Sequence, residues 1–336
     1  MNNPQLSLST VANQLVAPSK GILAADESTG TMTKRLDAIH VESTLENRNK
    51  WREIMMTSTG VESYISGVIL YDETLRTPTL GGVKLQDLFQ SKKIHIGIKV
   101  DGGTVKLPGL GEEVFIQGLD KLGKRLLEYK ELGATFTKWR AVYSVGENMP
   151  SDAVITGNSI ALAQYAALVQ EAGLVPIVEP EILVLTGSHT IETSKEITKK
   201  VLTDVFRWLK EFKVDLKGML LKPNMVLPGK EHLAMTSADD IAKFTVETLL
   251  ATVPPEVPGM VFLSGGLNPD QSTEYLAKMN QLYAGKLPWQ LSYSYGRALQ
   301  QEGLQAWSGK QENVTTAQKV FLDRAKKVSQ ARSGKI

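Results

Sequence analysis

The sequence predicts an α/β protein of the (β/α)8 barrel class, and three observations support this prediction. Short apolar runs alternate with longer amphipathic segments through nearly all of the 336 residues. Eight of these runs have the length of a strand, and no linker or low-complexity tract divides the chain. Several runs are apolar on both alternating faces, as parallel strands covered on both sides must be. Eight strand–helix units in one uninterrupted chain favour a closed TIM barrel over an open doubly wound sheet.

The predicted strands carry apolar side chains and end at turn-forming or polar residues. The fifth is typical, because Ile177 and Val178 place apolar side chains on its two opposite faces. In chain order, the eight predicted strands are Gly21–Asp26, Tyr64–Tyr71, His95–Asp101, Thr135–Val142, Val175–Leu183, Gly218–Met225, Gly259–Ser264 and Trp289–Tyr293.

The predicted helices lie between these strands. In Ser159–Ala172 the apolar side chains form one stripe, and Gly173 then ends the helix as a C-terminal cap. We expect a last helix from Thr315 to Val328 and a polar tail from about residue 329, so that residues 1–336 form a single domain. The remaining predicted helices are Thr44–Thr59, Gly118–Leu132, Ser194–Phe212, Ala238–Ala251 and Asp270–Gln281.

Composition excludes several classes of function. The net charge of +2 gives no sign of a face that binds nucleic acid or a membrane. The chain has no cysteine, which removes disulfides, thiolate catalysis and sulfur-ligated metal sites. The four histidines are not spaced as metal ligands on one helix face. We therefore expect no metal and no other cofactor.

The N-terminal residues predict a cytoplasmic protein. Met1 to Leu15 lack the basic start and the continuous apolar core of a signal peptide. No stretch of the chain approaches the length of a membrane span. A processed plastid form is the alternative.

Lys222 stands inside an apolar run, Gly218 to Val226, that reads as a buried strand ending at Pro223. A buried lysine must either pair with a carboxylate or be made neutral by desolvation. A neutral amine in a dry pocket is a nucleophile suited to forming a Schiff base with a carbonyl. The alternative is a lysine at a strand end whose ammonium group reaches water.

Charged side chains recur at the carboxyl ends of five predicted strands. In a barrel these ends converge on one mouth, where active sites are built, and alternate spacing directs each pair to one face. Any single case could be a polar residue that only marks where a strand leaves the core. Five strands in series favour a shared site for amine and acid–base chemistry. These residues are Asp26, Lys99, Asp101, Lys138, Arg140, Glu179, Glu181 and Lys222.

Two loops at the same end predict a phosphate site. Ser264, Gly265 and Gly266 directly follow the seventh strand, and Gly296-Arg297 stands where the eighth strand enters a helix. Barrels frequently bind phosphate between these loops, with backbone N–H groups and a helix N-terminus. The glycine pair could also serve only to make a turn. After the first strand, Asp26 to Thr31 could be a helix cap or, with Lys34 and Arg35, a second phosphate locus.

Seven segments form a specific set of motifs in order along nearly the whole chain. They are Lys20–Gly30, Gly97–Asp101, Lys138–Arg140, Ile177–Leu183, Leu221–Met225, Phe262–Gly266 and Ser294–Leu299. Together they resemble the class I fructose-1,6-bisphosphate aldolases. Asn313–Phe321 is most similar to the plant-type and photosynthetic members.

The resemblance implies a (β/α)8 barrel lyase without a metal, which reversibly cleaves fructose 1,6-bisphosphate to dihydroxyacetone phosphate and glyceraldehyde 3-phosphate in glycolysis, gluconeogenesis or the Calvin cycle. It implies that Lys222 forms a Schiff base with the ketone carbon. Glu179 would shuttle protons during this step, and Asp26 would take the proton of the C4 hydroxyl. Lys138 would supply positive charge beside the imine, with Glu181 as its supporting partner.

The resemblance also implies the substrate-binding residues and the assembly. The family is commonly tetrameric, so we expect a homotetramer that binds a small sugar bisphosphate. Arg140 belongs with the substrate-binding residues. The residues around the C1 phosphate would be Ser264, Gly265, Gly266, Ser294, Gly296 and Arg297, and those around the C6 phosphate Ser28, Thr31, Arg35 and Lys99.

Two positions depart from the family pattern. Many members end in a tyrosine that moves a proton at the enamine carbon, and Ile336 stands at the end of this sequence. We expect that another group serves this step or that the step is slower. Thr31 stands where relatives often have serine, and its hydroxyl is retained.

Four alternatives compete with a class I fructose-1,6-bisphosphate aldolase. A transaldolase or a pyruvate aldolase also uses a lysine Schiff base, but two phosphate loci favour a bisphosphate. Sedoheptulose 1,7-bisphosphate is a credible second substrate, because it shares the reacting end. A non-catalytic scaffold barrel would be expected to lack Lys222, Glu179 or Asp26, and all three are present. A metal-dependent aldolase is disfavoured by the absence of paired histidines.

Overall fold

The computed structural model describes residues 6–336, and its centre is a closed barrel of eight parallel strands. Around the barrel the strands follow the order β1-β10-β9-β8-β7-β6-β3-β2. The predicted (β/α)8 fold is therefore confirmed. The barrel strands are β1 Gly21–Ala25, β2 Ile65–Leu70, β3 His95–Lys99, β6 Ala134–Tyr143, β7 Val175–Ile182, β8 Leu220–Leu221, β9 Gly259–Phe262 and β10 Gln290–Tyr295.

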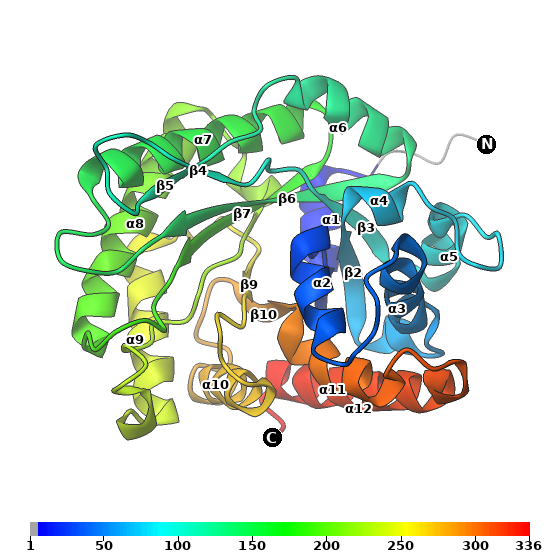
Figure 1. Cartoon of the computed structure of the whole chain (residues 1–336). Coiled ribbons are helices and arrows are strands. Elements are labelled where there is room, and N and C mark those ends of the chain that lie inside the picture. Colours follow the sequence, from blue (N-terminus) through cyan, green and yellow to red (C-terminus); the bar gives the residue numbers. More distant parts are fainter. Residues whose placement is uncertain (1–5) are drawn as a thin grey trace.

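Helices surround the strands (Figure 1), and most of those predicted are present with small shifts at their ends. The largest shift is in α7, which begins at Asp152 because Ser151 caps it by accepting a hydrogen bond from the Val154 backbone N–H. The last helix extends to Arg332, beyond its predicted end. The helices predicted from the sequence are α3 Leu45–Thr57, α6 Leu122–Glu131, α7 Asp152–Glu171, α8 Ile191–Glu211, α9 Ala238–Thr252, α10 Pro269–Leu282 and α12 Val314–Arg332.

Several elements lie outside the predicted set. Apart from α11, they are too short to carry a clear apolar period, so their pattern resembles that of loops. Helix α11, Arg297–Trp307, begins where the eighth strand was expected to enter a helix. The additional elements are α1 Leu8–Leu15, α2 Thr29–Asp37, α4 Asp72–Leu75, α5 Leu85–Lys92 and the antiparallel pair β4 Thr104–Lys106 and β5 Val114–Ile116.

Strand β8 is much shorter than predicted, and this affects the position of Lys222. Pro223 has no backbone N–H, so regular pairing stops before it. The Lys222 backbone N–H still donates to the Val178 carbonyl at 2.8 Å. Lys222 therefore lies one residue beyond the strand, with its backbone fixed by β7.

Helix α1 closes the amino end of the barrel. Val11, Leu15 and Val16 pack in one buried cluster with interior strand residues such as Phe136 and Val175. The contact is close, because a Cβ on Gly67 of β2 would lie 2.6 Å from a methyl group of Leu15. Within residues 6–336 the barrel interior is therefore a packed core, and an active site is expected at the carboxyl ends of the strands.

Candidate active site

A cavity of about 350 Å³ opens at the carboxyl ends of the barrel strands. All sixteen residues to which the resemblance assigns a catalytic or substrate-binding role line it, from seven of the eight barrel strands or the segments that follow them. This convergence is the geometric result of the closed parallel barrel, because each contributing strand ends at the same mouth.

Four buried charged side chains form an alternating row at the floor of the cavity. The Lys138 Nζ lies 2.7 Å from Asp26 Oδ2 and 3.3 Å from Glu179 Oε2. On its other side, Glu179 Oε1 lies 3.2 Å from the Lys222 Nζ. Glu179 thus bridges the two lysines, and its carboxylate is within proton-transfer distance of the Lys222 amine.

The charges in this row shift the pKa values of Asp26, Lys138 and Glu179 toward their ionised forms. Burial opposes the charge of Asp26, but Lys138 and Lys222 outweigh it and hold the pKa of Asp26 well below its ordinary value. Burial also opposes the charge of Glu179, and Lys138 and Lys222 again lower its pKa. For Lys138, Asp26 and Glu179 outweigh burial and raise its pKa well above the ordinary lysine value. The site therefore offers two carboxylates as proton acceptors and one permanent ammonium group.

Glu181 differs from the expectation, which made it the partner of Lys138. Its carboxylate forms an ion pair with Arg140 instead, and burial raises its pKa. The reason is the spacing along the strands. Glu181 and Arg140 each lie two residues beyond Glu179 and Lys138, nearly 7 Å nearer the mouth. Lys138 is supported by Asp26 and Glu179.

Lys99, the last residue of β3, is held by Asp101, which lies two residues later in the chain. Its ammonium group forms an ion pair with Asp101 and donates to the Asp101 backbone carbonyl at 3.1 Å. The Asp101 carboxylate also accepts a hydrogen bond from the Gly103 backbone N–H at 3.2 Å. Asp101 does not line the cavity itself, so it acts as the anchor of a cation that does.

The loops after β9 and β10 form a cradle of free donors. Gly265 and Gly266 have φ angles of 52° and 90°, a region that favours glycine. Helix α11 begins after Gly296 without a side-chain cap, so its first N–H groups can meet an anion. The buried Ser294 hydroxyl has no hydrogen-bond partner among the described residues. Arg297 donates to the Gly266 carbonyl at 2.6 Å and so links the two loops.

The segment after β1 combines a helix cap with cavity-lining side chains. Ser28 caps α2 by accepting from the Thr31 backbone N–H, and the two hydroxyl oxygens lie 3.2 Å apart. The Arg35 guanidinium pairs with Glu27. Glu27 lines the cavity but lay outside the predicted site. Its carboxylate also accepts a hydrogen bond from Gln300, which is far away in the chain, so no local pattern signals its role.

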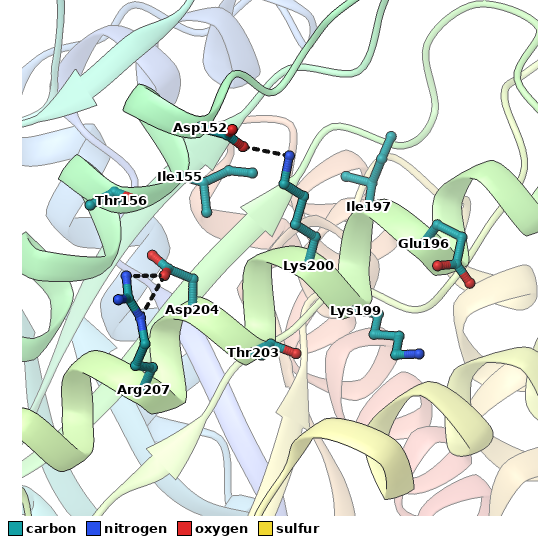
Figure 2. A pocket seen from close by; sticks show the side chains of 10 residues that line it. All are labelled: Asp152, Ile155, Thr156, Glu196, Ile197, Lys199, Lys200, Thr203, Asp204 and Arg207. Atoms are coloured by element: carbon teal, nitrogen blue, oxygen red, sulfur yellow. Dashed lines mark hydrogen bonds and ion pairs between the residues drawn. The ribbon is translucent and has the colours of Figure 1, made fainter.

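A larger cavity, of about 790 Å³, lies between α7 and α8 on the outside of the barrel (Figure 2). None of the predicted site residues lines it. Four of its charged side chains form two ion pairs: the Lys200 Nζ on α8 lies 2.6 Å from Asp152 on α7, and Arg207 lies 2.6 Å from Asp204 on the same helix, α8 (Figure 2). The strand-end cavity, in contrast, gathers catalytic side-chain types from many elements.

Within residues 6–336, no group of three or more His, Cys, Asp or Glu side chains is arranged to hold a metal ion. In the same part of the chain, no helix has the length and apolar character that crossing a membrane requires.

Comparisons with known proteins agree with this geometry. A family model described as Fructose-bisphosphate aldolase class-I matches residues 7–336. Cytosolic fructose-bisphosphate aldolase 4 of Arabidopsis thaliana is 51% identical over 317 residues, which cover 94% of this chain and 80% of that protein. The fructose-bisphosphate aldolase of Dictyostelium discoideum is 49% identical and covers 98% of this chain and 92% of its own. A solved aldolase from Plasmodium falciparum, in complex with TRAP and an inhibitor, superposes with a TM-score of 0.95 at 47% identity, over 98% of this chain and 94% of its own.

Proposed function

Because the chain belongs to the class I fructose-bisphosphate aldolase family, an enzyme family that acts on a sugar bisphosphate, we propose that Lys222 is its Schiff-base nucleophile. The observation that carries this proposal is the bridge that Glu179 makes between Lys222 and Lys138. A lysine amine needs a nearby base to accept its proton and an acid to release water from the carbinolamine. Glu179, 3.2 Å from the Lys222 Nζ, is placed for both transfers.

Bond cleavage follows from the same row of charges. Asp26, ionised beside Lys138, takes the proton of the C4 hydroxyl. The C3–C4 bond then breaks, its electron pair moves into the protonated imine, and the aldehyde leaves. The Lys138 ammonium stays charged and stabilises the carboxylates and the developing oxyanion nearby. Protonation of the enamine and hydrolysis of the imine release dihydroxyacetone phosphate.

The two phosphate groups would be held at opposite sides of the mouth. We assign the C1 phosphate to the cradle of Ser264–Gly266, Ser294 and the start of α11, where free N–H groups and Arg297 converge. Ser28, Thr31 and Lys99 are assigned to the other phosphate, and Arg140 with Glu181 to the rim between them. Arg35 lies close to Gly296, nearer the cradle than the resemblance implies.

Location and assembly are proposed on the relatives. The plant relatives include proteins named cytosolic and cytoplasmic, and we infer a cytoplasmic enzyme. We further propose a homotetramer. Multi-angle light scattering of the purified chain tests this directly, since a mass near that of one or two chains contradicts it.

Trapping of the imine tests the mechanism. The protein is incubated with dihydroxyacetone phosphate and a chelator, reduced with borohydride and digested for mass spectrometry. We expect a stable adduct on Lys222, and none in Lys222→Met. Lys217→Met, an exposed lysine five residues earlier, is the matched control and should keep the adduct. Absence of an adduct in the unmodified protein would remove the assigned roles together.

A further inference from the structure

Gln300 occupies a buried position between α11, α3 and the end of β1. Its amide Nε2 donates to the Ala24 carbonyl at 2.6 Å and to Glu27 Oε1 at 2.8 Å. Its Oε1 accepts from the Trp51 indole N–H at 3.0 Å. An indole nitrogen can only donate, so the amide oxygen must face Trp51 and both amide hydrogens must face the β1 end. The side chain therefore has one orientation in which every group is satisfied.

Glu27 is fixed from two directions at this point. Gln300 holds its carboxylate, and the fully buried Arg52 donates to its backbone carbonyl at 2.7 Å. Glu27 stands between Asp26 and Ser28, which both line the cavity. Its carboxylate in turn pairs with the Arg35 guanidinium. These contacts connect the buried Gln300, through Glu27, to the guanidinium of Arg35 in the cavity.

The contacts of Gln300 and Glu27 direct Arg35 toward the phosphate cradle. Its Nη2 lies 3.7 Å from where a Cβ on Gly296 would be, at the start of α11. Arg35 projects from the short helix α2 and is part-exposed, so without a partner its long side chain would sample many rotamers. Pairing with a fixed carboxylate removes much of that freedom before the substrate binds.

We propose that Gln300 is a positioning residue that, through Glu27, holds Arg35 for the phosphate bound at Gly296. Gln300 does not line the cavity, so it acts on substrate affinity through its neighbours and not on the reacting atoms. The inference rests on the proposed function, from which it takes the position of the C1 phosphate.

Gln300→Glu separates this role from a general role in packing. The variant keeps an oxygen for the Trp51 N–H, but it loses both donors and places a second carboxylate against Glu27. We expect the KM for fructose 1,6-bisphosphate to rise about tenfold or more. This is the size of effect expected when the charge-assisted contact between Arg35 and the phosphate is lost. We expect kcat to change by less than about threefold, because the contact serves bound substrate and transition state alike. The KM for fructose 1-phosphate should rise by the same factor, since it carries the phosphate in question.

Two further variants keep the test decisive. Glu27→Gln leaves the buried amide in place, so a properly folded protein is expected, and it should raise both KM values in the same way. Gln305→Glu, exposed on the same helix, is the matched control and should leave them unchanged. Unchanged KM values in Glu27→Gln, or a rise for the bisphosphate alone, overturn the proposal. Borohydride trapping on Lys222 is measured in parallel: its failure in the unmodified protein refutes the proposed function, whereas trapping with unchanged KM values refutes only the role of Gln300.

Discussion

At the scale of single residues, the site is a compromise between ionisation and burial. Asp26, Lys138, Glu179 and Lys222 are removed from water, which disfavours their charged forms, and only their mutual contacts offset this cost. Each member therefore depends on the next. A substitution in the row is expected to affect folding stability as well as chemistry.

Asp26→Asn should show this dependence on pH. Removing one partner of a buried ion pair typically costs about 3–5 kcal/mol at neutral pH. The pKa of Asp26 is lowered in the folded protein, so its contribution is complete above the ordinary aspartate value of about 4 and is lost as the pH falls through the folded value. We expect the difference in free energy of unfolding between the two proteins to shrink below about pH 4.

Urea denaturation at a series of pH values measures this difference. Asp37→Asn removes an exposed carboxylate and is the control, for which we expect little effect at any pH. A stability gap for Asp26→Asn that stays constant down to pH 3 would contradict the linkage.

At the scale of elements, the sequence predicted much of the site because strand ends are local features. A charged residue that closes an apolar run is visible without a structure, and the barrel rule then brings such residues together. The pairing of Glu181 with Arg140 and the roles of Glu27 and Gln300 were missed for a physical reason. They depend on the register between neighbouring strands, or on contacts between segments that are far apart in the chain.

Small residues in the barrel wall are a second element-scale feature. A Cβ on Gly97 of β3 would lie 2.2 Å from the Phe136 ring, which fills the barrel interior. We expect Gly97→Ala to lower the free energy of unfolding by about 1–3 kcal/mol through overpacking. Gly123→Ala is the control, because a Cβ there meets nothing within 4 Å on helix α6. It should stabilise the protein by up to about 1 kcal/mol. Equal effects of the two substitutions would contradict this account.

The cradle glycines predict a separate effect on binding. Gly266 has a φ of 90°, so Gly266→Ala should strain the loop between β9 and α10 and weaken phosphate binding. We expect the KM for fructose 1,6-bisphosphate to rise about tenfold, on the scale of one lost hydrogen bond to a charged group. Steady-state kinetics measures this, and an unchanged KM would exclude the loop from the phosphate site.

At the scale of the whole molecule, binding of a ligand at the mouth of the barrel should stabilise the folded protein. A ligand that binds in this cavity favours the folded state, because the unfolded chain has no such cavity. At a concentration of about 100 times its Kd, it adds about 2.7 kcal/mol to the free energy of unfolding. Thermal denaturation with and without dihydroxyacetone phosphate measures the gain. Lys222→Met should retain part of it, because phosphate contacts remain, and the absence of any shift in the unmodified protein would contradict the site.

Helix α1 closes the amino end of the barrel, and this closure also constrains how substrates and products reach and leave the site. Leu15, Phe136 and their neighbours fill the amino end of the barrel. Substrates and products therefore enter and leave through the opening at the carboxyl ends of the strands. In the proposed mechanism, the fragment attached to the buried Lys222 stays in the site when the aldehyde leaves. The aldehyde therefore leaves first and dihydroxyacetone phosphate second, and the next substrate can bind only after both products have left.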